Sequence, residues 1–267
     1  MDLELKGRRV LITGSSSGIG EATARMLAEE GARVVVHGRN RARVESVAQA
    51  IGAAGIAIGE LGNDDGAAAV IEQARAALGG EIEVLVNNAG GNATPNASRA
   101  PLGTSAADYL ANLQVNLLAA VRLANLTVPA MVAAGWGRVI NVSSGVAAQP
   151  NNLGSDYSAA KAALNNFTVT LAGSLKRSGV TVNTVTPGII LGEGMLRWGR
   201  SRYGDEAMTV DEVTRRLAED RVIVLPPAGR LGRPDEVAAV ICMLASARLG
   251  FVTGSNYRVD GGQIRGV

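Results

Sequence analysis

The sequence predicts an α/β fold: a doubly wound, predominantly parallel sheet of about seven strands with helices on both faces. Short apolar runs alternate with segments of helical periodicity from Arg9 to Val185, and the connections are only a few residues long. Parallel strands need a right-handed crossover, usually a helix, so this alternation is typical of one layered sheet. The 267 residues include 34 glycines and are 47% hydrophobic. These values fit close helix–sheet packing in one domain that spans residues 1–267.

The expected strands are short apolar runs bounded by glycine or polar residues, as buried parallel strands usually are. The expected helices are longer segments of periodic hydrophobicity, the first of which ends at Gly31, a plausible C-cap. Pro129 removes a backbone donor, so the fourth helix should be bent or interrupted there. The strands are Arg9–Thr13, Arg33–His37, Ile56–Ile58, Ile82–Val86, Arg138–Val142, Val180–Val185 and Val252–Val259, and the helices are about Glu21–Glu30, Asn40–Gly52, Asp64–Leu78, Ser105–Ala134, Ser155–Lys176 and Pro234–Ala245.

The alternation stops between about residues 190 and 227. This stretch is polar and charged, contains Trp198 and Tyr203, and is long for a simple connection. Long connections in compact domains are usually functional. We therefore expect residues 190–227 to form a substrate lid, and we use that name for them below.

The composition argues against several classes of protein. The net charge is only +2 and no basic run alternates with aromatic residues, so a nucleic-acid partner is not expected. The single cysteine, Cys242, excludes an internal disulfide and fits a reducing compartment. No signal peptide or apolar stretch of ~18 residues is apparent, so a cytoplasmic protein without a membrane span is expected. We also expect no metal site.

A glycine-rich turn follows the first expected strand, in Thr13–Gly20 (TGSSSGIG). Glycines allow close backbone approach, and the N-terminus of the next helix offers N–H groups to a pyrophosphate, as in a Rossmann-type fold. The turn lacks the Lys-Ser/Thr of a P-loop. Residues 14–18 also match G-x-S-x-G, the nucleophile elbow of α/β-hydrolases. In such a hydrolase the serine is followed in the chain by an acidic residue and then by a histidine. The only histidine is His37, at the end of the next strand, so a serine hydrolase is not expected. We expect the His37 side chain to face a loop.

The end of the second strand indicates which dinucleotide is bound. An acidic residue there would hold the ribose 2′-hydroxyl of NAD. The sequence instead has Gly38 and Arg39, and a guanidinium matches a phosphate in charge and geometry. NADP(H) is therefore favoured over NAD(H), although Arg39 could also be a solvated arginine.

Tyr157 and Lys161 lie four residues apart in the Ala-rich helix expected at Ser155–Lys176, which places them on one helical face. An unperturbed phenol ionises near pH ~10, and a nearby ammonium lowers that pKa. The pair could therefore exchange a proton with a substrate oxygen. Taken alone, the same spacing also fits two surface residues that are helical neighbours.

Together these motifs resemble those of the short-chain dehydrogenase/reductase family, in its single-domain members similar to β-ketoacyl-acyl-carrier-protein reductases. The likeness covers nearly all of the chain. It rests on Thr13–Gly20, Asn87–Gly90, Asn116, Ser144, Tyr157 with Lys161, Asn183 before Pro187-Gly188, Gly232–Ala238, and Thr253-Gly254 before Asp260–Gly262.

The resemblance implies the roles of the catalytic residues. Tyr157 would be the general acid in reduction, and Lys161 would lower its pKa and bind the nicotinamide ribose. Ser144, at the family's spacing from the tyrosine, would orient the carbonyl in preference to Ser143. Asn116 would hold a water that relays protons to Lys161. The substrate would be a small carbonyl compound or alcohol, and the protein would be a homotetramer or a homodimer.

The resemblance also implies a cofactor site along the carboxyl ends of the strands. Three departures from the family pattern bear on that site: Glu60 stands where an aspartate often contacts adenine, Gly192 replaces a threonine that binds the carboxamide, and the lid is long. The expected cofactor residues are Gly14, Ser16, Ser17, Gly18, Ile19, Gly20, Arg39, Asn40, Glu60, Leu61, Asn88, Ala89, Gly90, Tyr157, Lys161, Pro187, Gly188 and Ile190.

Other functions stay open at this point. A non-catalytic NADP(H) sensor would need only the cofactor half of these residues, and a serine hydrolase would need a missing histidine. A carrier-protein substrate would dock on basic residues; Lys176 and Arg177 fit this, but the segment Met131–Gly137 before the fifth strand is neutral.

Overall fold

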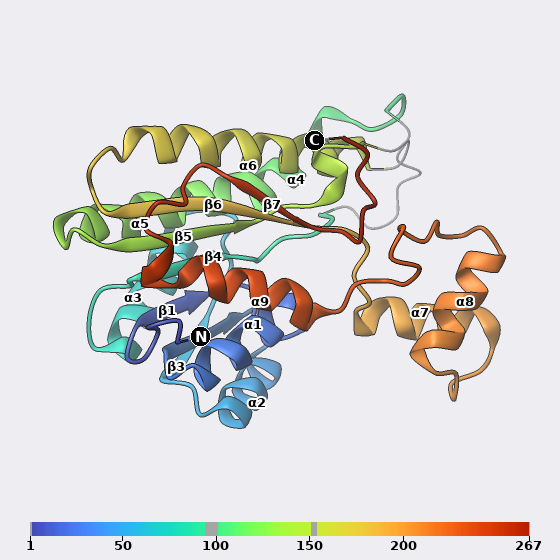
Figure 1. Ribbon diagram of the computed structural model, residues 1–267, viewed down its shortest axis with the longest axis horizontal. Helices are drawn as coiled ribbons and strands as arrows, with labels where there is room; N and C mark the ends of the chain where they lie inside the picture. The colour runs from blue at the N-terminus through green and yellow to red at the C-terminus, as the bar shows by residue number, and fades with distance from the viewer. Residues whose placement is uncertain (1, 94–100, 151–153, 267) are drawn as a thin grey trace.

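The computed structural model of the protein describes residues 2–93, 101–150 and 154–266. Its centre is a seven-stranded sheet in the order β3-β2-β1-β4-β5-β6-β7, and every neighbouring pair is parallel (Figure 1). The predicted fold class is therefore confirmed. The strands are β1 Arg9–Ile12, β2 Arg33–Gly38, β3 Gly55–Ile58, β4 Val84–Asn87, β5 Gly137–Val142, β6 Val180–Pro187 and β7 Asn256–Val259.

The apolar runs predicted as strands are buried on both faces of the sheet. In β1, Val10, Leu11 and Ile12 are all 0% exposed. Val10 and Ile12 belong to one core cluster, while Leu11 belongs to the cluster on the opposite face. Because successive side chains in a strand point to opposite faces, a central parallel strand needs an unbroken apolar run. The sheet thus separates two cores.

Helices cover both faces (Figure 1). The first core lies under α1 Gly18–Glu29, α2 Arg41–Ile51 and α9 Pro234–Ala245. The second lies under α3 Asp64–Leu78, α5 Ala119–Ala133 and α6 Ser155–Ser174. The chain crosses from one face to the other where the strand order reverses, between β1 and β4. In doubly wound sheets this switch point opens a crevice at the carboxyl ends of the strands.

The long helix after β4 is interrupted, but not at the predicted place. It consists of α4 Ala106–Leu113, a π-helical turn Gln114–Leu118 and α5, which runs through Pro129 without a break. The Asn116 side chain donates to the Asn112 carbonyl oxygen at 3.1 Å and so competes for the acceptor of the regular i→i−4 bond. The expected break near Pro129 was wrong, and the break lies instead at a polar side chain.

By length and composition, the helical run Ala106–Ala133 is the one candidate membrane span among the described residues. It is a core helix in this fold. Leu123 is 1% exposed in the second core, and the Arg122 guanidinium pairs with Asp64.

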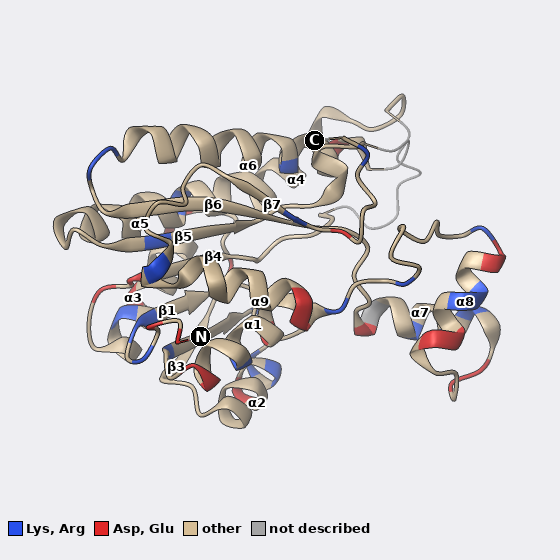
Figure 2. Ribbon diagram, viewed as in Figure 1, with Lys and Arg blue, Asp and Glu red and all other residues tan. Residues whose placement is uncertain are grey.

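The lid contains two helices, α7 Glu193–Tyr203 and α8 Val210–Glu219, which extend from the body of the molecule (Figure 1). Sequence periodicity did not reveal them. A small core of their own, built from Met208, Val213 and Leu217, holds them together. Both signs of charge occur on α8 (Figure 2), where Arg215 pairs with Glu219 at 2.8 Å.

Candidate active site

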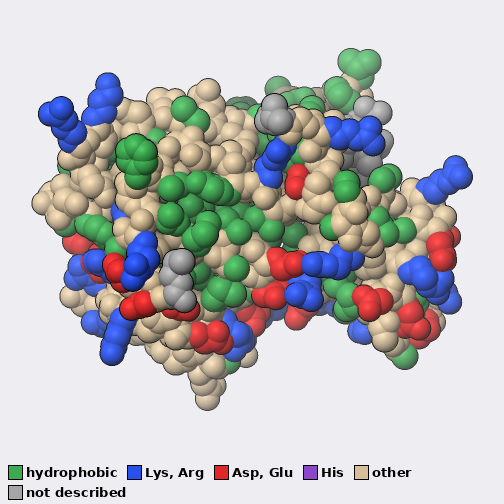
Figure 3. Space-filling view, in the orientation of Figure 1, with side chains coloured by type: hydrophobic (Ala, Val, Ile, Leu, Met, Phe, Trp, Pro, Cys, Tyr) green, Lys and Arg blue, Asp and Glu red, His purple; other side chains and the backbone are tan. Residues whose placement is uncertain are grey.

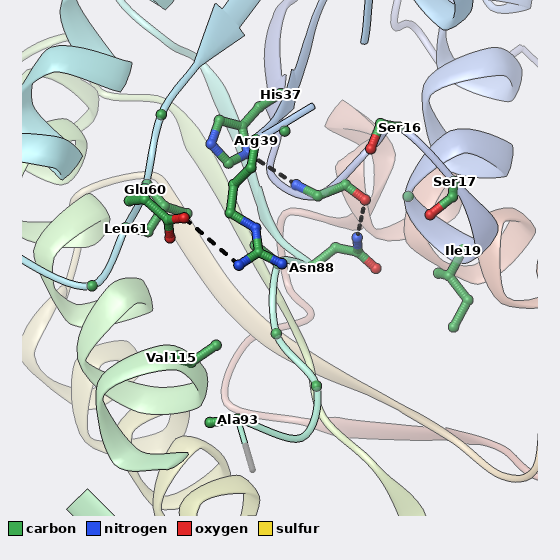
Figure 4. A pocket seen from close by; sticks show the side chains of 18 of the residues that line it. Ser16, Ser17, Ile19, His37, Arg39, Glu60, Leu61, Asn88, Ala93 and Val115 are labelled. Atoms are coloured by element: carbon green, nitrogen blue, oxygen red, sulfur yellow. Dashed lines mark hydrogen bonds and ion pairs between the residues drawn. The ribbon is translucent and has the colours of Figure 1, made fainter. Parts of the chain in front are cut away.

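The carboxyl ends of β1, β2 and β4 surround a cavity of about 710 Å³ at the switch point (Figure 4). Its walls come from the glycine turn, the end of β2, the segment after β3 and the segment after β4. The lining residues are Gly14, Ser16, Ser17, Ile19, Gly20, His37, Gly38, Arg39, Gly59, Glu60, Leu61, Gly62, Asn88, Ala89, Gly90, Gly91, Asn92, Ala93 and Val115.

The glycine turn is shaped for a ligand that approaches the backbone. Gly14 has φ +64°, and a Cβ added there would lie 2.9 Å from the Ala89 Cα, so no side chain fits. Ser17 is the N-cap of α1 but makes no side-chain cap hydrogen bond. The open helix N-terminus therefore faces the cavity with its partial positive charge, and this suits a pyrophosphate. The residues present fit a dinucleotide.

Asn88 fastens the end of β4 to this turn. Its side-chain amide donates to the carbonyl oxygen of Thr13 at 2.9 Å and to that of Gly14 at 3.0 Å. Figure 4 shows the second of these bonds. The Thr13 hydroxyl in turn accepts from the backbone N–H groups of Asn88 and Ala89. Asn88 thus acts as a clamp that holds two strand ends at a fixed separation.

His37 is a cavity residue whose role the sequence did not indicate. It is 3% exposed, and its Nδ1 accepts the Gly14 backbone N–H at 3.0 Å (Figure 4). The His37 backbone N–H donates to the Ser15 hydroxyl at 2.9 Å. Burial lowers the pKa of His37 to about 4, so the imidazole is neutral at pH 7. It supports the glycine turn, and its Nδ1 is occupied by a backbone N–H, not by the serine hydroxyl that a hydrolase would require.

Arg39 lies at the cavity rim, where a 2′-phosphate was expected. Its guanidinium is 3.6 Å from the Glu60 carboxylate, and the two side chains are 77% and 66% exposed (Figure 4). Exposed ion pairs contribute little stability, so a phosphate can displace Glu60. A neighbouring hollow is lined by Ser16, Ser17, Arg39, Asn40 and Arg43. Asn40 also caps α2 by accepting the Arg43 backbone N–H at 3.1 Å.

Seven predicted cofactor residues are not in the lining of the main cavity: Gly18, Asn40, Tyr157, Lys161, Pro187, Gly188 and Ile190. Gly18 lines a separate hollow between α1 and the start of the lid. Pro187 ends β6, and a Cβ on Gly188 would meet Asp260 and the Gln263 side chain at 2.8 Å. Ile190 pairs with Gly232 in an isolated bridge. Pro187, Gly188 and Ile190 thus lie at the end of β6 and just after it, not in the cavity over β1.

Tyr157, Ser144 and Lys161 come together at the ends of β5 and α6. The Ser144 hydroxyl is hydrogen-bonded to the Tyr157 phenol, whereas the Ser143 hydroxyl donates to the Lys161 backbone carbonyl at 3.4 Å. The structure therefore places Ser144, and not Ser143, beside the tyrosine. The Lys161 Nζ is 5.8 Å from the centre of the Tyr157 ring and donates to the Val142 carbonyl at 2.8 Å.

The pKa values of Tyr157 and Lys161 differ from what their helical spacing predicts. Burial raises the pKa of Tyr157, and the Ser144 hydrogen bond opposes that rise only in part. Burial lowers the pKa of Lys161 to about 8. The expected lowering of the tyrosine pKa by Lys161 is not seen in the protein alone. A protonated phenol at neutral pH is nevertheless the form that donates a proton to a carbonyl oxygen.

Asn116 joins the same site from the π turn. Its Oδ1 accepts the Gly91 backbone N–H at 3.0 Å, and its Nδ2 donates to the Gly91 carbonyl at 2.9 Å. A Cβ on Gly90 would lie 2.7 Å from the Asn116 Oδ1 and 3.3 Å from the Lys161 Nζ. A cavity of about 10 Å³ is lined by both Asn116 and Lys161, and it has room for about one water.

The arrangement can bind a dinucleotide, hold a carbonyl group and deliver a proton to it. Among the described residues, no group of three or more His, Cys, Asp or Glu side chains is arranged to hold a metal ion. The polar side chains gathered here are the hydroxyls of Ser144 and Tyr157 and the amine of Lys161.

Comparison with known proteins identifies the family of the chain. The family described as short chain dehydrogenase matches residues 8–200. The chain is 34% identical to the acetoacetyl-CoA reductase of Cupriavidus necator over 157 residues, which are 58% of this chain and 57% of that protein. The matched region thus spans less than two thirds of that relative.

Two solved structures match over almost their whole length. The L-sorbose reductase of Gluconobacter frateurii, complexed with NADPH and L-sorbose, is 31% identical, has a TM-score of 0.89 and is covered completely, as is this chain. A 3-oxoacyl (acyl-carrier-protein) reductase of Agrobacterium tumefaciens with NADP bound is 31% identical, with a TM-score of 0.84 and coverage of 98% of this chain and 96% of that one. The chain belongs to the short-chain dehydrogenase family.

Proposed function

We propose that this protein is an NADP(H)-dependent oxidoreductase that transfers a hydride between the nicotinamide and a carbonyl or secondary alcohol. The observation that carries the proposal is the group of Ser144, Tyr157 and Lys161 beside the dinucleotide cavity. The protein's contribution would be position and electrostatics, because the cofactor supplies the hydride.

In the reductive direction, Ser144 and Tyr157 would both hydrogen-bond the carbonyl oxygen and so polarise the carbon. Tyr157 would then donate its proton to that oxygen as negative charge develops there. Lys161 lies on the same helical face as Tyr157, and its ammonium would stabilise the resulting phenolate. The small cavity between Lys161 and Asn116 would hold the water that returns a proton to this group.

Arg39 and the hollow beside it support the preference for NADP(H). Arg39 and Arg43 line that hollow together with two serine side chains. Two guanidinium groups and two hydroxyls match the charge and the acceptors of a 2′-phosphate. The two solved relatives with 31% identity were described with NADPH or NADP bound.

The substrate class proposed is a small carbonyl compound or secondary alcohol, with L-sorbose as the first probe and acetoacetyl-CoA as a thioester for comparison. These are the compounds in the names of the relatives described above. A carrier-protein thioester is less well supported, because the segment Met131–Gly137 before β5 has no charged residue that could dock an acidic carrier.

A non-catalytic sensor is the alternative that uses the same cavity. A sensor would need the glycine turn and Arg39 to bind the cofactor, but it would not need the hydroxyls of Ser144 and Tyr157. The close arrangement of Ser144 with Tyr157, and of Asn116 with Lys161, favours turnover.

We further propose a cytoplasmic homotetramer. Cys242 is free and buried, which suits a reducing compartment. Two separate surfaces carry exposed apolar side chains: Leu110 and Val169 on α4 and α6, and Met243 and Phe251 near β7 and α9. Figure 3 shows apolar side chains gathered over β7 and α9. Two different two-fold interfaces would build a tetramer.

The test is the substitution Tyr157→Phe. It removes the proton donor but keeps the ring, so turnover should fall by ~10²-fold or more while NADPH affinity stays nearly unchanged. Oxidation of NADPH would be followed by its absorbance against L-sorbose, acetoacetyl-CoA and small cyclic ketones, with NADH in parallel.

Ser143→Ala is the matched control, because its hydroxyl contacts the Lys161 backbone and not the phenol. Turnover that survives Tyr157→Phe would overturn the proposed role of the tyrosine. NADPH binding without turnover of any probe by the unmodified protein would favour the sensor.

A further inference from the structure

Behind Asn116 lies a chain of buried side-chain amides that ends at a carboxylate. Asp156, Asn112 and Asn116 are 1%, 0% and 2% exposed, respectively. The Asn112 Nδ2 donates to the Asp156 Oδ2 at 2.7 Å, and the Asn116 Nδ2 donates to the Asn112 Oδ1 at 3.3 Å. The three residues come from α4, the π turn and the first turn of α6.

The chemistry of the last member sets the direction of the chain. An ionised carboxylate only accepts hydrogen bonds, whereas an amide can turn either its NH₂ or its oxygen toward a neighbour. The Asp156 Oδ2 accepts from the NH₂ of Asn112, and this leaves the Asn112 oxygen facing the other way. That oxygen accepts from the Asn116 Nδ2 and from the Ala93 backbone N–H at 3.2 Å.

The same constraint passes to Asn116. Its Nδ2 donates to the Asn112 Oδ1 and also to the backbone carbonyls of Asn112 at 3.1 Å and Gly91 at 2.9 Å, while its Oδ1 accepts the Gly91 N–H at 3.0 Å, so all four contacts favour one orientation of the amide. This oxygen lies on the side of the Lys161 Nζ, since both are close to the position of a Gly90 Cβ. A reversed Asn116 would present N–H groups to the lysine instead of an acceptor.

We infer that Asp156 and Asn112 are positioning residues that fix the orientation of the Asn116 amide and of residues 91–93 beside the active site. This inference rests on the proposed function for its catalytic consequence, but the orientation itself does not depend on turnover. Burial makes the chain sensitive, because an unsatisfied polar group there costs far more than one in water.

The experiment exchanges the two outer residues. Asn112→Asp places one carboxylate against another and breaks the chain. The double variant Asn112→Asp with Asp156→Asn restores it, since the new amide donates to the new carboxylate, which still accepts from Asn116 and Ala93. Tyr109→Phe is the matched control: it removes a neighbouring α4–α6 hydrogen bond, from the Tyr109 hydroxyl to the Ser155 hydroxyl at 3.0 Å, outside the chain.

The first readout is the side-chain amide NMR signal of Asn116 in the protein without substrate, assigned by its loss in Asn116→Asp. It should shift in Asn112→Asp and move back toward the original position in the double variant, where a carboxylate replaces the amide oxygen as its acceptor, and Tyr109→Phe should leave it unchanged. If the double variant shows no Asn116 signal near the original position, or if Asn112→Asp leaves the signal in place, the inference is wrong. The double variant keeps this test decisive even if Asn112→Asp fails to fold.

The second readout is turnover of L-sorbose and acetoacetyl-CoA with NADPH. Asn112→Asp should lower kcat about 10-fold, within the ~100-fold that a misplaced catalytic group can cost, with little change in the KM for NADPH. The kcat of the double variant should recover to within about 3-fold of the kcat of the unmodified protein. If Tyr157→Phe leaves turnover unchanged, the proposed function is refuted, but the NMR result on the Asn116 amide still stands. A strong Tyr157→Phe effect with no Asn112→Asp effect would refute only this inference.

Discussion

At the residue scale, His37 shows how the cofactor turn depends on the charge of one side chain. Its Nδ1 can accept the Gly14 N–H only while the ring nitrogen is unprotonated. Protonation would place a donor against a donor and would put a charge in a buried position. The imidazole therefore links the shape of the glycine turn to its own ionisation.

This link predicts a pH dependence of stability. Burial lowers the pKa of His37 from 6.5 to about 4 in the folded protein. Between these values the unfolded state binds the proton and the folded state does not, so stability falls as the pH falls. The contribution of His37 to this loss is about 3 kcal/mol between pH 6.5 and pH 4.

His37→Asn should remove that contribution, because an amide oxygen can accept the Gly14 N–H and does not titrate. Urea unfolding at about pH 4, 5, 6 and 7 would measure the slope of the free energy of unfolding against pH. Comparison with the unmodified protein removes the contribution of the carboxylates, which both proteins share. Parallel slopes in the two proteins would show that His37 is not neutral and buried in this way.

Several site residues could be predicted from sequence because their signal is local. The i, i+4 spacing of Tyr157 and Lys161 determines their common face, and the glycine turn follows directly from a strand. His37 and Asp156 gave no such signal. Their partners lie 23 and 44 residues away in the chain, and only folding brings them together.

At the element scale, the lid is the least integrated part of the fold. Met208, Val213 and Leu217 form its core with partners from the lid itself. A Cβ on Gly199 would lie 2.3 Å from the Val213 side chain, so α7 and α8 approach closely through a glycine. A segment with a separate core can open without unfolding the sheet.

Leu217→Ala tests this independence. Truncation of a buried leucine costs about 2–5 kcal/mol, and here the cost should fall on the lid alone. Hydrogen exchange in residues 193–219 should accelerate while the main thermal transition stays in place. KM for the carbonyl should rise and NADPH affinity should not change, because the cofactor cavity has no lining residue from the lid among the described part of the chain.

Leu123→Ala is the control, since Leu123 is 1% exposed and belongs to the core beneath the sheet. It should lower the main transition instead. If Leu217→Ala lowered that transition by as much as Leu123→Ala, the lid would be part of the cooperative unit.

At the scale of the whole molecule, the two apolar surfaces make the proposed assembly testable. Phe251 is 102% exposed beside β7, and a charge in the centre of an interface is costly to bury. Phe251→Asp should therefore convert a particle of four 27.3 kDa chains into one of two, as measured by light scattering after gel filtration.

Val224→Asp provides the comparison, because Val224 is 80% exposed but lies in the lid. It should leave the particle size unchanged. A monomer before any substitution, or no effect of Phe251→Asp, would contradict an interface over β7 and α9.

The sequence by itself determined the order of the strands and of the helices packed on the sheet, the parallel sheet, the glycine turn, and the positions of Tyr157 and Lys161, but not the lid helices α7 and α8. These follow from periodicity and from residues close together in the chain, where local geometry leaves few choices. Ser144 and Asn116 were instead selected by the family resemblance.

Only the tertiary structure decided the π turn in place of a break at Pro129, the separate core of the lid and the Arg39–Glu60 ion pair. It also revealed the amide chain from Asp156 to Asn116. The amide chain depends on which distant groups share a buried space, and the ion pair depends on which strand ends lie side by side. The π turn and the lid core depend on local packing that the hydrophobic periodicity does not show. In a buried space hydrogen-bond donors and acceptors must be matched, and no local pattern in the sequence states which partner will be present.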